Sequence, residues 1–82
     1  MPPVKLYTLS TCSHCKNTKQ YLNNLGVRYD FIDVDLLQGQ ERADMIEEVK
    51  RYNPAVSFPT ILIGERHIVG FKENEIREAL GL

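Results

Sequence analysis

The chain has 82 residues, of which 43% are hydrophobic, and a formal net charge of −1 from ten basic and eleven acidic side chains. This size favours one domain over residues 1–82, near the lower limit at which a hydrophobic core stabilises a fold by itself. Because the charges are scattered and no apolar run of about 18 residues occurs, we expect neither a nucleic-acid surface nor a membrane span.

A strand followed by a helix opens the chain. Residues 4–9 alternate in the manner of a half-buried strand. Residues 13–25 repeat their apolar positions at three- and four-residue steps, which predicts an amphipathic helix that Gly26 ends. Polar residues, Lys19 among them, are expected to face solvent. The inward positions of this helix are Cys15, Thr18, Leu22 and Leu25.

The only two cysteines stand at the start of that helix, in Cys12-Ser13-His14-Cys15. Residues three apart on a helical turn bring their Cβ atoms to about 5–6 Å, close enough for a disulfide to form. Unpaired backbone N–H groups and the helix dipole favour a thiolate at Cys12, so we predict that it is the nucleophile. His14 and Lys16 are expected to tune its ionisation. Cys15, on the inward side, is predicted to be a buried resolving cysteine.

The compartment and the zinc chemistry bear on the role of this pair. With no leader-like start, we expect a cytoplasmic protein, and we also expect a monomer. In the reducing cytoplasm a CxxC pair is more often catalytic or metal-binding than structural. Structural zinc needs four ligands, and the sequence adds only His14 on the same turn and His67 in a distant hairpin. We therefore predict no metal site.

The rest of the chain predicts three further strands and two further helices. In order, these are a strand over residues 27–35, a helix over 41–52, strands over 59–63 and 67–69, and a helix over 73–80. The alternation over 27–35 is compatible with burial on more than one side. A helical crossover joins the first two strands and a tight turn joins the last two. The order β-α-β-α-β-β-α therefore predicts an α/β fold with a mixed sheet.

Three motifs follow one another along the whole chain. The CxxC opens a helix after a strand, Phe58-Pro59-Thr60 precedes the hairpin, and Val69-Gly70-Phe71 precedes the last helix. In these motifs the chain resembles the glutaredoxins. The resemblance implies a thioredoxin/glutaredoxin fold with a four-stranded mixed sheet flanked by three helices, and a cis bond at Pro59, where sequence alone favours trans. The residues that it implies at the substrate are Ser57, Phe58, Pro59, Gly70, Phe71 and Glu73.

Several positions depart from the glutathione-binding pattern of that family. Leu9 stands where typical glutaredoxins have a lysine, and Ser57-Phe58-Pro59 replaces Thr-Val-Pro. Val69 replaces the first glycine of a pair, and Glu73 alone could stand in for the following acidic residue. A negatively charged tripeptide would meet one fewer cation and a bulkier wall, so glutathione is expected to bind weakly. The chain is more similar to small glutaredoxin-like proteins that take electrons from a thioredoxin-reductase-like flavoprotein or another dithiol donor.

The predicted function is that of a thiol–disulfide oxidoreductase, which reduces protein disulfides in electron transport and cell redox homeostasis. Cys12 attacks the substrate, Cys15 resolves the mixed disulfide, and an external donor restores both thiols. No tightly bound cofactor is expected. Two alternatives stay open: a glutathione-dependent glutaredoxin, and a carrier in which Cys12 ligates an iron–sulfur cluster shared between two chains.

Overall fold

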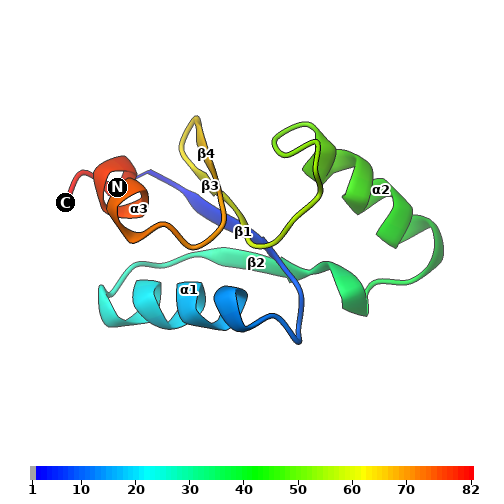
Figure 1. The fold of residues 1–82 in the computed structure, drawn as a ribbon, viewed down its shortest axis with the longest axis horizontal. Helices are drawn as coiled ribbons and strands as arrows, with labels where there is room; N and C mark the ends of the chain where they lie inside the picture. Colours follow the sequence, from blue (N-terminus) through cyan, green and yellow to red (C-terminus); the bar gives the residue numbers. More distant parts are fainter. Residues whose placement is uncertain (1) are drawn as a thin grey trace.

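A computed structural model of the protein describes residues 2–82 and contains one mixed sheet flanked by helices (Figure 1). The strands are β1 (Val4–Thr8), β2 (Asp30–Asp33), β3 (Thr60–Ile63) and β4 (Arg66–Val69). The helices are α1 (Ser13–Asn24), α2 (Gly39–Lys50) and α3 (Glu73–Leu80), with a 3-10 turn, η1, over Val34–Leu36. The predicted order of strands and helices is confirmed.

The sheet has the strand order β2-β1-β3-β4. β1 pairs parallel with β2, in a register that places Thr8 opposite Asp33, and antiparallel with β3. β3 and β4 form an antiparallel hairpin. The predicted parallel first pair and antiparallel last pair are both confirmed.

The two faces of the sheet pack against different helices. Val4 and Leu6 of β1 belong to an apolar core that α1 and α3 close, while Tyr7 belongs to a second cluster that includes Val49 of α2. The hydroxyl of Tyr7 also donates to the carboxylate of Glu48, which ties α2 to the middle of the sheet. In Figure 1, α3 and α2 lie toward opposite ends of the molecule. No helix within residues 2–82 has the length and apolar character needed to cross a membrane.

The second strand is shorter than its sequence predicts. The backbone N–H of Val27 bonds to Leu22 in the turn that closes α1, so it is not free to pair in the sheet. After Asp33 the chain turns into η1. Because β2 is an edge strand with β1 as its one neighbour, Asp30 and Phe31 are exposed. Tyr29 nevertheless packs against one core cluster and Ile32 against the other, so the segment is partly buried on both sides, as its alternation allows.

Candidate active site

Cys12 lies in the turn between β1 and α1 and caps the helix. Its backbone is extended, and its Sγ accepts a hydrogen bond from the backbone N–H of Cys15 at 3.2 Å. No acidic residue occupies the first turn of α1, and the side chain is half-buried. The sulfur of Cys12 thus lies at the positive end of the helix dipole and is reachable from solvent, an environment that favours a thiolate.

Cys15 occupies a different environment one turn along the same helix. Its side chain is 1% exposed, so its predicted burial is confirmed. Burial, followed by the hydrogen bond with Cys12, raises the pKa of Cys15 to about 12. Both cysteines carry free thiols. The pair therefore consists of one accessible sulfur and one that is protonated and shielded at neutral pH.

The segment before β3 faces the thiol of Cys12. The Phe58–Pro59 peptide bond is cis, as the resemblance implied. The carbonyl oxygen of Phe58 lies 4.0 Å from Cys12 Sγ, and Pro59 is buried. The backbone N–H of Gly70 donates to the carbonyl of Pro59 at 2.8 Å. The structure thus brings together Cys12, Phe58 and Pro59, and it joins Gly70 to them through the backbone.

Asn53 holds this segment in place and was not identified from the sequence as a residue of the site. It is 4% exposed, and its Nδ2 lies within hydrogen-bonding distance of the carbonyl and hydroxyl oxygens of Ser57 and of Thr60 Oγ1. Thr60 in turn donates to the carbonyl of Ser57 at 2.8 Å. The signal in the sequence, an asparagine before a proline, indicates a helix end and does not specify these partners.

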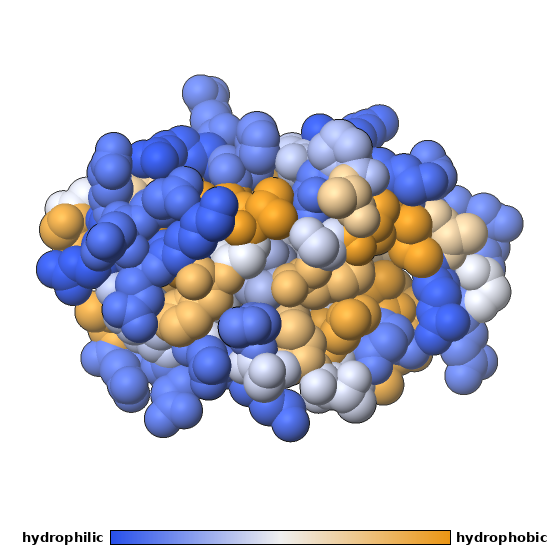
Figure 2. Space-filling view, viewed as in Figure 1, coloured by the Kyte–Doolittle hydropathy of each residue, from blue (hydrophilic) through white to orange (hydrophobic). Residues whose placement is uncertain are grey.

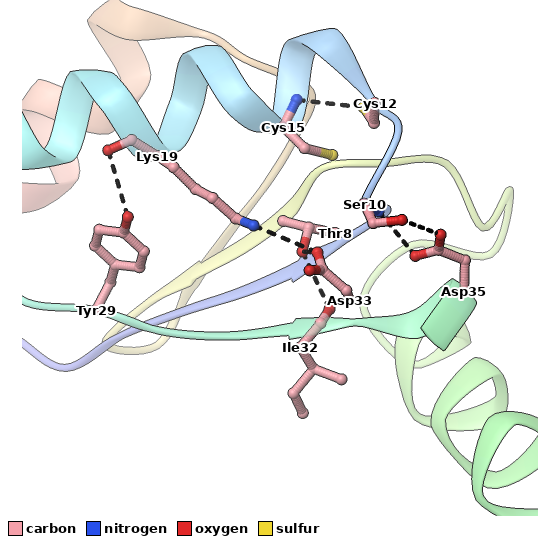
Figure 3. A network of polar contacts seen from close by, with 9 residues as sticks. All are labelled: Thr8, Ser10, Cys12, Cys15, Lys19, Tyr29, Ile32, Asp33 and Asp35. Carbon is pink, nitrogen blue, oxygen red and sulfur yellow. Dashed lines mark hydrogen bonds and ion pairs between the residues drawn. The ribbon is translucent and has the colours of Figure 1, made fainter. Parts of the chain in front are cut away.

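A polar cluster underlies Cys15, as Figure 3 shows. Lys19 Nζ lies 3.3 Å from Asp33 Oδ1, and the hydroxyl of Thr8 lies 2.6 Å from the same oxygen. The side chain of Lys19 is 22% exposed. The prediction that it faces solvent is therefore wrong, because its long side chain bends back across the helix surface toward β2.

A second polar contact fixes the turn that carries Cys12 (Figure 3). The hydroxyl and the backbone N–H of Ser10 both donate to the carboxylate of Asp35 in η1. These two hydrogen bonds, that of the hydroxyl first, lower the pKa of Asp35 below its ordinary value of 3.8. The turn is thereby tied to the far end of β2.

The side chains of four further residues predicted for the site form no hydrogen bond with either sulfur. The side chains of His14 and Lys16 are exposed and form no hydrogen bond or ion pair with any residue among 2–82. Phe71 packs edge-on against Tyr21, with ring centroids 5.6 Å apart, as part of the core under α1 and α3. Glu73 begins α3 and is exposed.

An apolar groove of about 260 Å³ adjoins the site. It shares Phe58 with the segment that faces Cys12, although Cys12 itself does not line it. Hydrophobic residues gather on this face of the molecule between α2 and the sheet (Figure 2). The groove is lined by Leu9, Val34, Asp35, Arg42, Ile46, Val56 and Phe58.

Comparison with known proteins agrees with this geometry. Residues 4–68 match the family model described as Glutaredoxin. The chain belongs to the glutaredoxin family. It is 50% identical to methanoredoxin of Methanosarcina acetivorans, with a TM-score of 0.92, covering 99% of this chain and 86% of that one. The glutaredoxin of Methanosarcina mazei Go1 is 55% identical, with a TM-score of 0.90 and coverage of 99% and 80%.

A third solved structure differs in its described activity. NrdH-redoxin of Escherichia coli is a glutaredoxin-like protein with a thioredoxin-like activity profile. It is 25% identical to this glutaredoxin, with a TM-score of 0.73, covering 93% of this chain and 92% of that one. Within residues 2–82 of this glutaredoxin, no three or more His, Cys, Asp or Glu side chains are grouped so that they could hold a metal ion.

Proposed function

We propose that this glutaredoxin reduces protein disulfides and is itself reduced by a thioredoxin-reductase-like flavoprotein or another dithiol donor. Cys12 is the nucleophile and Cys15 the resolving cysteine. Protein disulfides are the substrates, glutathione is a poor partner, and no tightly bound cofactor takes part.

The contrast between the two sulfurs carries this proposal. Cys12 is reachable, accepts the N–H of Cys15 and lies at a helix N-terminus, all of which favour its thiolate. Cys15 is 1% exposed, and its pKa is raised to about 12. A substrate disulfide can therefore reach one sulfur only, and the other becomes important after the first bond has formed.

The reaction follows from this order. The thiolate of Cys12 attacks one sulfur of the substrate disulfide, and the second substrate sulfur leaves as a thiolate. Cys15 then attacks Cys12 Sγ in the mixed disulfide, which forms the Cys12–Cys15 bond and releases the other substrate thiol. Two electrons have passed to the substrate, and an external dithiol returns them. The carbonyl of Phe58, beside Cys12 Sγ, supplies an acceptor to the backbone of an extended substrate.

The surroundings of Cys12 support a donor other than glutathione. Leu9, in place of the lysine of typical glutaredoxins, lines the apolar groove. The one cation in that lining is Arg42, whose guanidinium donates a hydrogen bond to the carbonyl oxygen of Asp35 at 2.6 Å. A glutathione carboxylate would meet mainly apolar surface there, whereas an apolar side chain of a protein partner fits it. The likeness to NrdH-redoxin, which has a thioredoxin-like activity profile, points the same way.

Cysteine variants test the roles of the two sulfurs. We expect iodoacetamide at neutral pH to modify Cys12 before Cys15. Cys15→Ser should accumulate a mixed disulfide with insulin, and Cys12→Ser should trap nothing and lose insulin reduction. Faster modification of Cys15, or turnover by Cys12→Ser, would contradict the proposal. Visible absorbance of protein purified without oxygen would instead favour an iron–sulfur carrier.

A comparison of donors tests the second half of the proposal. NADPH oxidation coupled to insulin reduction should be faster with thioredoxin reductase than with glutathione and glutathione reductase. The double variant Leu9→Lys/Val69→Gly, which restores the cation and the glycine of typical glutaredoxins, should raise the glutathione-linked rate several-fold. Equal rates of the unmodified protein with the two donors would show that glutathione is an adequate partner.

A further inference from the structure

A lysine and an aspartate form an ion pair on the inner side of α1, close to the buried cysteine. The side chains of Lys19 and Asp33 are 22% and 15% exposed, and Nζ lies 3.3 Å from Oδ1. The ammonium group also lies 3.9 Å from the ring centroid of Phe31. Lys19 comes four residues after Cys15, so the two side chains share one face of the helix (Figure 3).

A contact within the sheet, between Thr8 of β1 and Asp33 of β2, fixes the position of this ion pair. Thr8 is fully buried and faces Asp33 directly in the parallel register of β1 and β2. Its hydroxyl lies 2.6 Å from Asp33 Oδ1 and 3.2 Å from the carbonyl oxygen of Ile32. Asp33 is thus fixed by β1, and Lys19 by Asp33 and Phe31. Removing a lysine from solvent in this way is costly unless a partner compensates, so its ammonium has a fixed place rather than a mobile one.

We propose that Lys19, held by Asp33, is a positioning residue for the second chemical step, in which its ammonium stabilises negative charge on Cys15 Sγ as that sulfur attacks the mixed disulfide. This inference rests on the proposed function, because it takes Cys15 to be the resolving cysteine. It assigns a role to a side chain that the helical pattern alone places at the surface.

In this step the thiol of Cys15 gives up its proton, which passes to solvent. Its sulfur then forms a bond to Cys12 Sγ, the bond between Cys12 and the substrate breaks, and the departing substrate thiolate takes up a proton from solvent. The titratable groups that face Cys15 are Cys12 and Lys19 on α1, and Asp33 on β2 behind Lys19. Residues 57–60 and 69–71 contribute none. Burial raises the pKa of Cys15, and a backbone hydrogen bond with Leu9 and, to a smaller extent, the charge of Lys19 act against it.

The two steps can be followed separately with a chromogenic aromatic disulfide. Attack by Cys12 releases the first coloured thiolate, and attack by Cys15 on the mixed disulfide releases the second. In Lys19→Met we expect the second phase at neutral pH to slow by about tenfold, the order of a partly screened charge pair, while the first stays within about twofold. The pH at which the second phase reaches half its maximal rate should rise. Lys19→Arg should restore most of the rate.

The controls separate this effect from a change in folding. Lys50→Met makes the same substitution on an exposed lysine of α2 and should change neither phase. Because Lys19→Met leaves Asp33 without its cation, the double variant Lys19→Met/Asp33→Asn removes both charges. It should fold as the unmodified protein does and still show the slow second phase.

The outcomes distinguish this inference from the proposed function. An unchanged second phase and pH profile in Lys19→Met, or equal slowing of both phases, would overturn the inference alone. If the unmodified protein released no second thiolate, or Cys15→Ser still released it, the proposed function would fail, and the inference with it.

Discussion

The two ends of the sheet are built from different kinds of side chain. At the end where β1 begins, Val4 lies opposite Ile63 of β3, and both belong to the apolar core. At the other end, next to the cysteines, the buried residues include Thr8, Asn53 and Thr60. An apolar end needs only volume, whereas each buried polar group needs a partner at the right distance and angle.

The difference shows what the polar end contributes. Asn53 fixes the segment that faces Cys12, and Thr8 fixes Asp33 beneath Cys15. Both side chains act on the surroundings of a sulfur without touching it. We therefore expect substitutions at the apolar end to change stability alone, and substitutions at the polar end to change stability and reactivity together.

The largest expected effect lies at the apolar end. Ile63→Ala removes a side chain that is 2% exposed and should lower the free energy of unfolding by about 2–5 kcal/mol through the cavity that it leaves. Urea unfolding measures this loss. The rate of insulin reduction per folded molecule should stay unchanged. A slower rate under conditions in which the variant is fully folded would contradict the expectation that the apolar end affects stability alone.

At the polar end, Asn53→Ala should lower the free energy of unfolding by about 1–3 kcal/mol, because Ser57 and Thr60 lose a buried hydrogen-bond partner. Loosening of that segment should also slow the reaction of Cys12 with a protein disulfide. Unfolding curves and reaction rates are compared with those of Asn74→Ala, a substitution at an exposed site of α3. A loss of stability with an unaltered rate would show that Asn53 supports the fold only.

A smaller effect is expected from Thr8→Val, which keeps the shape of the side chain and removes its donor to Asp33. The free energy of unfolding should fall by about 1 kcal/mol. Thr18→Val is the matched variant, since the hydroxyl of Thr18 donates to the backbone carbonyl of His14, which its own helix also satisfies. Equal losses in the two variants would show that the contact with Asp33 has no special value.

The smallest effect depends on pH. Hydrogen bonds from Ser10 lower the pKa of Asp35 in the folded protein below its ordinary 3.8, so folding favours the carboxylate. Its contribution to stability is present above that ordinary value and is lost as the pH falls through the lower folded value. The difference in unfolding free energy between the unmodified protein and Asp35→Asn should therefore be greatest near neutral pH and vanish in strong acid. A difference that grew in acid would contradict this sign.

The features that the sequence predicts well are local ones. The strand and helix around the CxxC, and the burial of Cys15 and Thr18, follow from three- and four-residue spacing alone. The cis bond before Pro59 is different, because the general preference of X-Pro bonds points to trans. Only the resemblance to the glutaredoxins reversed that expectation.

The features that it did not predict depend on elements that meet in space. The helical period places Lys19 outside, and only the arrival of Asp33 from β2 draws the side chain inward. The three acceptor atoms of Asn53 belong to Ser57 and Thr60, which lie beyond a turn whose path the sequence does not specify. The extent of β2 was overestimated for a similar reason, since its edge position depends on the strand order.

The two outer strands of the sheet, β2 and β4, span four residues each. β2 carries Asp30 and Asp33, and β4 carries Arg66 and His67. Short, charged edges offer little room for a strand from another molecule to add to the sheet. Resistance to aggregation is thus built into the two borders of the sheet.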